Sequence, residues 1–173
     1  MEPLTDGVVL LRPFREEDIP AIAAACSDSE IARFVPGIPQ PYTEKHACEF
    51  VRRCEEVLGA GSGWPGAIAD AKTDVFFGAI EVGLGDCGSI GYWVATEARG
   101  RGVATSALVL LSRWALREGA VERLELTTHP ENVASQRVAE KAGFVREGVL
   151  RSHIRFREGR RDSVLFSLLP SDL

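Results

Sequence analysis

The order of apolar and polar positions divides the chain into a series of strands and helices. A run rich in valine and leucine at residues 7–12 predicts a first strand. Acidic residues favour the first turn of a helix, so one helix is expected to begin at Glu16–Asp18, and a second is expected over residues 43–58 with Thr43 as its N-cap. The stretch 33–43 holds three prolines and is therefore predicted to be a loop.

Three strand candidates follow in series, at residues 66–71, 75–82 and 89–94. Their connections are short, which is typical of an antiparallel meander. Residues 103–118 then carry apolar positions three and four apart, the pattern of an amphipathic helix, and Gly119 is expected to end it.

The last part of the chain predicts a strand at residues 124–128, a short helix at 132–141 that Gly143 ends, and strands at 144–151 and 164–168. A strand, a helix and a strand at this spacing usually form a parallel pair with a right-handed crossover. The expected fold class is therefore α/β (α+β), with a mixed, mostly antiparallel sheet of about six or seven strands and about four helices packed on it.

Length and composition fit one globular domain. The chain has 173 residues, of which 45% are hydrophobic and 26% charged, so a single domain over residues 1–173 is expected. No apolar run approaches the roughly 18 residues of a membrane-spanning helix, and the acidic N-terminus does not resemble a secretory signal, so the expected location is cytoplasmic. The cysteines Cys26, Cys48, Cys54 and Cys87 lack metal-binding spacing and are expected to be buried thiols.

Charge is divided unevenly along the chain. Residues 1–98 carry 7 Lys and Arg against 16 Asp and Glu, a net charge of −9, whereas residues 99–161 carry 13 against 7, a net charge of +6. The second segment can therefore bind an anionic ligand, and the first can attract a cation. No nucleic acid is expected as a partner, because neither a strong basic face nor stacking aromatic residues stand out.

The most specific segment is the loop Arg99–Gly102, which leads into the helix that starts at Val103. Two glycines let the backbone turn without a Cβ clash, and the free N–H groups of a helix N-terminus bind anions, phosphate above all. A Walker loop is excluded because its lysine is missing, and a dinucleotide-binding loop is disfavoured because Thr105 replaces the third glycine. A glycine-rich connector without a ligand is the remaining alternative.

Two sequence blocks resemble the GNAT superfamily of N-acetyltransferases. Arg99-x-x-Gly102-x-Ala104 resembles its pyrophosphate-binding signature R/Q-x-x-G-x-G/A, and the segment from Asn132 to Gly148 resembles its N-x-x-S…G-F…E-G block. Segments 11–14, 41–43 and 91–94 are similar to the ribosomal-protein-type, or RimJ/RimL-like, branch. The resemblance covers nearly the whole chain.

The resemblance implies a GNAT fold whose sheet opens as a V between the strands 89–94 and 124–128, with acyl-coenzyme A in the opening. Pyrophosphate would lie on the loop amides, and the pantetheine arm would pair with the strand edge. A backbone N–H near Tyr92 or Trp93 would face the thioester oxygen, Asn132 would hold the pantetheine, and Ser135 would protonate the leaving thiolate. The implied cofactor-binding residues are Tyr92, Trp93, Val94, Arg99, Gly100, Arg101, Gly102, Val103, Ala104, Thr105, Asn132 and Ser135.

Local sequence gives Asn132 and Ser135 a second interpretation, because Asn132 is also a favourable helix N-cap and Ser135 falls at the third helical position.

The sequence does not identify the general base of the reaction. An alkyl ammonium must lose a proton before it attacks, and Glu81, His129 and His153 are the candidates. A protein N-terminal amine, with a pKa of about 8, would need less help.

The expected function is transfer of an acetyl group from acetyl-CoA to a primary amine, either a protein N-terminus or a small molecule, by direct attack in a ternary complex. We expect a monomer or homodimer with no metal and no membrane partner. One alternative is another acyl group such as succinyl, because Arg151, Arg155 and Arg157 could meet a carboxylate. The other alternative is a regulatory protein that binds acyl-CoA without catalysis, but the presence of Asn132 and Ser135 argues against it.

Overall fold

The computed structural model describes residues 2–118 and 121–173 and contains one mixed sheet. The sheet order is β1-β2-β3-β4-β5-β6-β8-β7, and β5 with β6 is its parallel pair. The strands are β1 (Leu4–Thr5), β2 (Val9–Arg12), β3 (Gly63–Asp70), β4 (Phe76–Gly83), β5 (Gly88–Val94), β6 (Leu124–Thr128), β7 (Val145–Phe156) and β8 (Gly159–Leu168). The predicted class, a mostly antiparallel mixed sheet with one parallel crossover, is confirmed.

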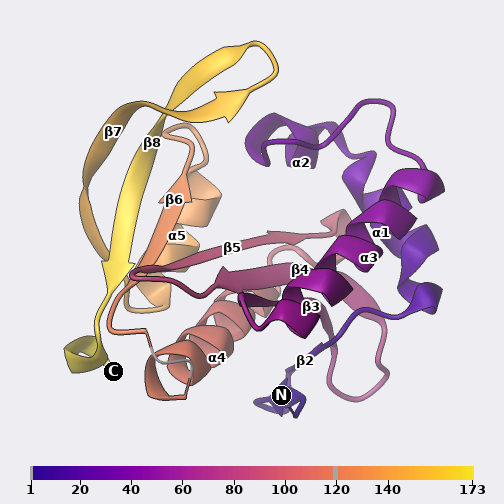
Figure 1. The fold of residues 1–173 in the computed structure, drawn as a ribbon, viewed down its shortest axis with the longest axis horizontal. Coiled ribbons are helices and arrows are strands. Elements are labelled where there is room, and N and C mark those ends of the chain that lie inside the picture. The colour runs from indigo at the N-terminus through magenta and orange to yellow at the C-terminus, as the bar shows by residue number, and fades with distance from the viewer. Residues whose placement is uncertain (1, 119–120) are drawn as a thin grey trace.

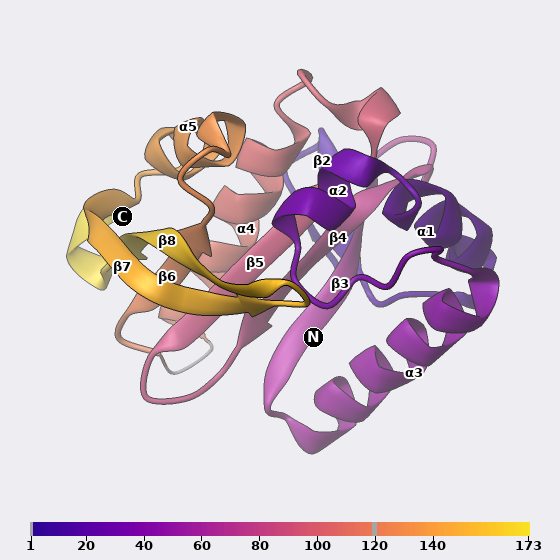
Figure 2. The same cartoon turned by 90° about the horizontal axis from the view of Figure 1, so that it is seen from above.

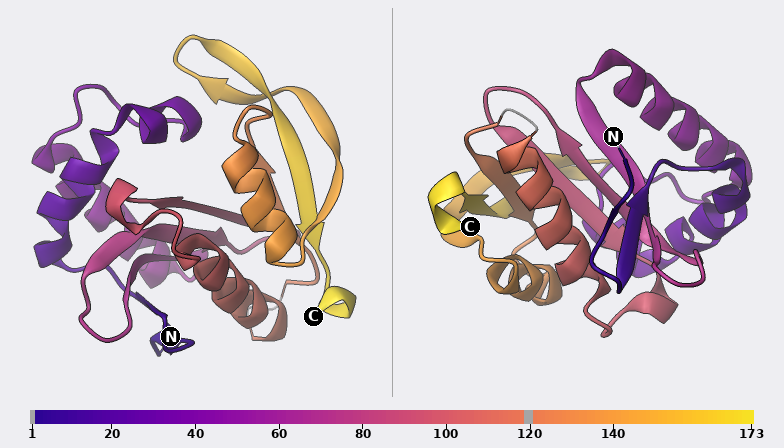
Figure 3. Two further views of the ribbon diagram at one scale, coloured as in Figure 1. Left: turned by 180° about the vertical axis from the view of Figure 1, so that it is seen from behind. Right: turned by 90° about the horizontal axis from the view of Figure 1, so that it is seen from below.

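Helices cover both faces of this sheet. They are α1 (Ile19–Cys26), α2 (Ser29–Phe34), α3 (Glu44–Ala60), α4 (Val103–Arg117) and α5 (Val133–Lys141), with 3-10 turns at Glu16–Asp18, Thr96–Ala98 and Pro170–Asp172. Figures 2 and 3 show α1 and α3 on one face and α4 and α5 on the other. Each face has its own hydrophobic cluster, one built around α4 and one around α1 and α3.

Helix α4 has the amphipathic pattern that the sequence predicts. Val103, Ala107, Leu108, Leu111 and Ala115 are all buried, and they recur at the three- and four-residue spacing of one helix face. The helix therefore lies along the sheet, under β5, with its N-terminus at the end of the glycine loop. Its expected stop, Gly119, lies outside the described residues.

The N-terminal part differs from the prediction in two elements. Strand β1 and helix α2 were not expected, and part of the predicted loop 33–43 belongs to α2, so the loop begins only at Val35. With two and six residues, these elements are too short to show a periodic pattern. Asp28 sets the start of α2 by accepting a hydrogen bond from the Glu30 N–H at 2.9 Å.

The cysteines and the C-terminal hairpin also need correction. Cys26 and Cys54 are buried as expected, whereas Cys48 and Cys87 are exposed. Strands β7 and β8 extend to a turn at residues 157–158 and are longer than predicted, because their outer halves are rich in charged residues and lack apolar alternation.

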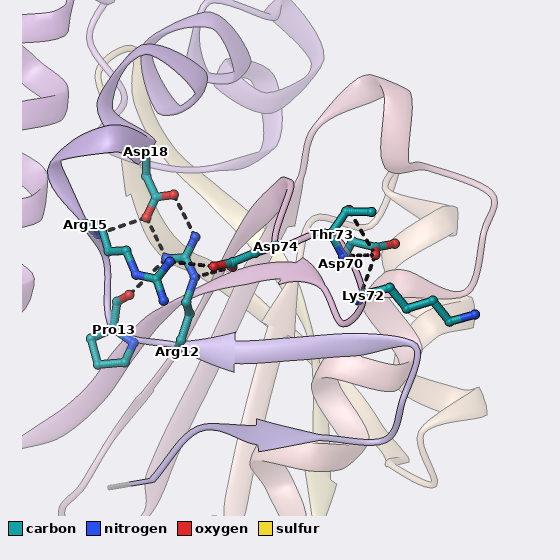
Figure 4. Close-up of polar contacts among 8 residues, drawn as sticks. All are labelled: Arg12, Pro13, Arg15, Asp18, Asp70, Lys72, Thr73 and Asp74. Carbon is teal, nitrogen blue, oxygen red and sulfur yellow. Dashed lines mark hydrogen bonds and ion pairs between the residues drawn. The ribbon is translucent and has the colours of Figure 1, made fainter.

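A buried arginine joins the start of α1 to the β3–β4 turn (Figure 4). Arg12 is 3% exposed and its guanidinium donates two hydrogen bonds to the carboxylate of Asp18, at 2.8 and 2.9 Å. Its Nε donates to Asp74 Oδ1 at 2.6 Å. The planar guanidinium matches a carboxylate in this bidentate geometry, so this side of the domain is held by a paired, desolvated charge.

Replacing Asp18 by alanine is expected to destabilise the fold by about 3 kcal/mol, since loss of one partner leaves a buried charge incompletely compensated. Urea unfolding would measure the free energy of unfolding. The adjacent Glu17 is exposed, and Glu17→Ala serves as the matched control with an expected change of less than about 0.5 kcal/mol. Equal losses in the two variants would contradict the structural role given to the Arg12–Asp18 pair.

Candidate active site

The parallel pair at the centre of the sheet opens into a cleft. Strand β5 pairs with β6 only at Gly88–Leu124 and Ser89–Glu125. Beyond these residues β6 turns away from β5, as Figure 1 shows. A cleft of about 740 Å³ lies along this opening, and its lining includes Tyr92, His129 and Ser135. The V-shaped opening implied by the family resemblance is therefore present.

The free edge of β5 carries main-chain groups that face the opening. The Gly88 N–H donates to the Arg123 carbonyl at 2.9 Å on the β6 side, and the Val94 carbonyl accepts a hydrogen bond from the Arg99 side chain at 3.2 Å. The Ala95 N–H instead donates to Phe77 on β4 at 2.8 Å. Because main-chain directions alternate along a strand, Tyr92 and Val94 face the opening. The main chain of Trp93 faces β4, so of the two candidates for an oxyanion donor only Tyr92 is directed into the cleft.

The glycine loop adopts the conformation that its composition favours. Gly100 and Gly102 have φ angles of 73° and 79°, in the left-handed region, and Gly102 occupies the N-cap of α4. The first helical hydrogen bond runs from the Ser106 N–H to the Gly102 carbonyl at 3.0 Å, so the N–H groups of residues 103–105 have no acceptor within the helix. Among the described atoms, nothing lies within 4 Å of a Cβ placed on either glycine. This donor set and the open space above it fit a pyrophosphate.

The two loop arginines are already engaged by protein partners. Arg99 donates to Asp28 Oδ2 at 2.7 Å and to the Val94 carbonyl at 3.2 Å. Arg101 places its guanidinium 4.7 Å from the centroid of the Phe77 ring. Arg99 therefore ties the loop to the α1–α2 turn and to the end of β5, in addition to adding positive charge beside the helix start.

Two hydroxyl groups meet across the opening. Asn132 Oδ1 accepts a hydrogen bond from the Ser135 N–H at 3.1 Å, so Asn132 is the N-cap of α5. The Ser135 hydroxyl lies 3.1 Å from the Tyr92 hydroxyl, which links α5 to β5. Burial raises the pKa of Tyr92 to about 12, and the hydrogen bond with Ser135 only partly offsets this effect. Tyr92 is therefore protonated at neutral pH and can supply a proton to this pair.

The three candidate bases have different surroundings in the structure. Glu81 lies in the cleft on β4, directly opposite Gly91 of β5, and desolvation raises the pKa of its carboxyl above the ordinary value, with Arg53 opposing the effect. His129 lines the cleft, but its Nδ1 accepts the Glu131 N–H at 3.1 Å, which leaves the proton on Nε2 and no free lone pair. His153 is not among the residues that line the cleft, and its Nδ1 lies 2.9 Å from the Ser163 hydroxyl.

Replacing Glu81 by glutamine is expected to lower kcat about 100-fold, if Glu81 takes the proton from the amine. The wild-type rate should fall on the acidic side as Glu81 becomes protonated, at a pH above that of an ordinary glutamate because its pKa is raised. In Glu81→Gln this acidic limb should disappear. A pH profile of kcat with one amine measures both effects, and an unchanged limb in the variant would remove Glu81 from the role.

Several cleft residues have no signal in the sequence. His46, Glu49 and Arg53 line the cleft from α3, and Asp162 lines it from β8. The first three follow one another at spacings of three and four, so they share one face of α3. The sequence spacing alone places these three residues on one helix face. Only the tertiary structure shows that this face borders the cleft.

Two further findings bear on the predicted partners. None of the helices in the described part of the chain is long and apolar enough to cross a membrane. Over residues 2–118 and 121–173, no group of three or more His, Cys, Asp or Glu side chains could hold a metal ion. The absence of a metal in the reaction stays a prediction.

Comparison with known proteins agrees with the fold and the loop. Residues 9–145 match the family described as the acetyltransferase (GNAT) domain. This match covers well over half of the chain, and the chain therefore belongs to the GNAT acetyltransferase family. The RimJ/RimL-like resemblance is supported by the solved structure of a RimJ, and the structure of a RimL has the same fold.

The structure of Mycobacterium smegmatis RimJ in complex with CoA-disulfide superposes with a TM-score of 0.87 at 26% identity and covers 99% of this chain and 87% of that one. RimL, the ribosomal L7/L12 alpha-N-protein acetyltransferase solved in complex with coenzyme A, has a TM-score of 0.86 at 19% identity over 97% and 98% of the two chains, a likeness that shows the fold alone. Among curated sequences, the Bacillus subtilis protein named "Probable N-acetyltransferase YjcK" is 34% identical over 83 residues, 48% of this chain and 46% of the relative. The matched segment thus spans about half the length of the first curated relatives.

Proposed function

We propose that the protein transfers an acetyl group from acetyl-CoA to a primary amine by direct attack in a ternary complex. The observation that carries the proposal is the opening between β5 and β6, which has the Tyr92–Ser135 hydroxyl pair in its wall, with the glycine loop tied to the end of β5 by the Arg99–Val94 hydrogen bond. Family membership and the coenzyme bound to M. smegmatis RimJ support the same donor. We also propose a cytoplasmic monomer or homodimer.

The loop Arg99–Gly102 and the free N–H groups at the start of α4 would hold the pyrophosphate of the donor. Tyr92 and Val94 would bind the pantetheine arm through their main chains, with Asn132 beside it. Acetyl-CoA supplies an activated thioester when bound. The Tyr92 N–H is directed into the cleft, where it would stabilise negative charge on the thioester oxygen.

Proton transfer from the amine and proton transfer to the leaving thiolate would take place on opposite faces of the sheet. Side chains alternate along β4 and β5, so Glu81 and Gly91 lie on the α3 face, whereas Tyr92 lies on the α5 face beside Ser135. Glu81 would take a proton from the ammonium on one side. The Ser135 hydroxyl, backed by Tyr92, would give a proton to the leaving thiolate on the other side, and the second proton that the nitrogen loses on forming the amide would return to this hydroxyl pair through solvent.

The succinyl alternative has less support from the site. Arg151, Arg155 and Arg157, which motivated it, are not among the described residues that line the cleft. Of the arginines in the described part of the chain, Arg53 does line the cleft, together with the acidic residues Glu49, Glu81 and Asp162. This excess of negative charge favours a cationic amine over an acidic acyl group or acceptor.

The experiment is a screen of primary amines and short peptides with acetyl-CoA, with succinyl-CoA as the matched donor. Product is detected by mass spectrometry, because Cys48 and Cys87 are exposed and would react with a thiol reagent. The expected result is acetylated amine and free CoA in equal amounts. Tight binding of acetyl-CoA without product from any amine would instead support the non-catalytic alternative.

A further inference from the structure

The second hydrophobic cluster of the protein is open on one side. Phe14, Cys26, Cys54 and Ala79 are buried members of the cluster beneath α1 and α3, and each also lines the cleft. Ile38, Tyr42, Phe50 and Trp93 are partly buried residues that pack against the cluster and line the same space. A core normally fills such a space with its own side chains, so this one leaves an apolar chamber for a ligand.

Both small residues and aromatic rings line the chamber. Cys26, Cys54 and Ala79 leave room where larger side chains would fill it, and the Phe14 and Phe50 rings stand edge to face with centroids 5.2 Å apart. Burial raises the pKa of Cys26 to about 11 and of Cys54 to about 12. Both thiols are therefore neutral and act as small apolar surfaces.

A carboxylate stands where this chamber meets the opening between the strands. Glu81 lies on the same face of the sheet as Ala79, two residues before it on β4, and as Trp93, which pairs with Ala79 on the neighbouring strand β5. Its cross-strand neighbour Gly91 has no side chain, and among the described atoms nothing lies within 4 Å of its would-be Cβ. The space in front of Glu81 is thus free for an ammonium group whose attached body extends into the chamber.

We propose that the acceptor is a primary amine carried on an apolar body about the size of an aromatic ring, with its nitrogen at Glu81 and its body in the chamber formed by Phe14, Phe50 and Trp93. The inference rests on the proposed function and names its substrate class. The same chemistry exists in a free arylalkylamine and in a peptide whose first residue is apolar, so the test has one arm for each.

The primary measurement is binding, which does not depend on turnover. Calorimetry on the protein saturated with CoA compares phenethylamine with ethylamine, and a tetrapeptide that begins with phenylalanine with one that begins with serine. Phenethylamine, the phenylalanine peptide, or both should bind at least about tenfold more tightly than the matched polar or small partner, since each buried methylene-sized group strengthens binding severalfold. Equal or weaker binding of the apolar member in both arms would overturn the proposal.

A substitution that fills the chamber tests whether the apolar body of the amine binds there. Cys54→Leu should reduce the preference for the apolar amine at least about fivefold by occupying the chamber. Cys48→Leu, on the exposed face of the same helix, is the matched control and should keep the wild-type preference. An unchanged preference in a folded Cys54→Leu protein would place the apolar body elsewhere.

The outcome also separates this inference from the proposed function. Apolar amines that bind with the expected preference but yield no acetylated product would contradict the acetyl transfer and leave the chamber assignment intact. Acetylation of small polar amines, without any preference for apolar ones, would contradict the chamber assignment alone.

Discussion

Replacing Gly102 by glutamate is expected to weaken acetyl-CoA binding by at least about a hundredfold, which corresponds to roughly 2.7 kcal/mol. The side chain would enter the open space above the loop, where the N–H groups of residues 103–105 have no acceptor within the helix and would bind the pyrophosphate. Its carboxylate would then compete with pyrophosphate for the same donors and repel it. Isothermal titration of acetyl-CoA into the folded variant gives the dissociation constant.

A matched glycine separates this effect from backbone strain. Gly61 ends α3 with a φ of 64°, and it too has nothing within 4 Å of a Cβ among the described atoms. Gly61→Glu imposes the same left-handed strain and the same charge outside the cleft, and it should bind acetyl-CoA like the wild type. If both variants bound the coenzyme normally, the loop would not be the pyrophosphate site.

The second large effect is expected at the hydroxyl pair. Ser135→Ala should lower kcat about 100-fold while changing the affinity for acetyl-CoA less than threefold, because general acid assistance acts on the leaving thiolate and not on the bound donor. Single-turnover rates with a saturating amine, together with calorimetric affinities, measure the two quantities. Equal turnover in wild type and variant would leave Ser135 as a residue of the helix start only.

The Tyr92 hydroxyl is expected to act through the serine. Tyr92→Phe keeps the ring and the main chain but removes the hydroxyl 3.1 Å from Ser135, so it should lower kcat by a smaller factor than Ser135→Ala. In the double variant the losses should not add, because both groups serve one proton transfer. Fully additive losses would contradict this linked arrangement.

The parts of the site that could be predicted are those encoded locally. The turn at Gly100 and Gly102 needs left-handed backbone, and the helix after it follows from apolar spacing, so a short stretch of sequence determines the anion cradle. The N-cap of α5 is equally local, since Asn132 bonds to an N–H only three residues away. The resemblance to GNAT motifs rests on the same stretches.

The parts that could not be predicted depend on long-range contacts. Arg99 looked free to bind phosphate, yet its carboxylate partner Asp28 lies 71 residues earlier. The polar face of α3 and the chamber beneath it border the cleft only because α3 packs on β3 and α1 packs on α3 and β4. No periodicity within one segment determines such packing, so the donor side was predicted in detail and the acceptor side was not.

Amide hydrogen exchange followed by NMR tests the central claim most directly, which is that acetyl-CoA occupies the opening between β5 and β6. The N–H groups of Tyr92 and Val94 face this opening, whereas that of Trp93 faces β4 and serves as the internal control. Saturating acetyl-CoA should slow exchange at Tyr92 and Val94 at least about tenfold, since the pantetheine arm would pair with this edge, and should leave Trp93 nearly unchanged. Saturable binding of acetyl-CoA with unchanged exchange at both residues would contradict the account.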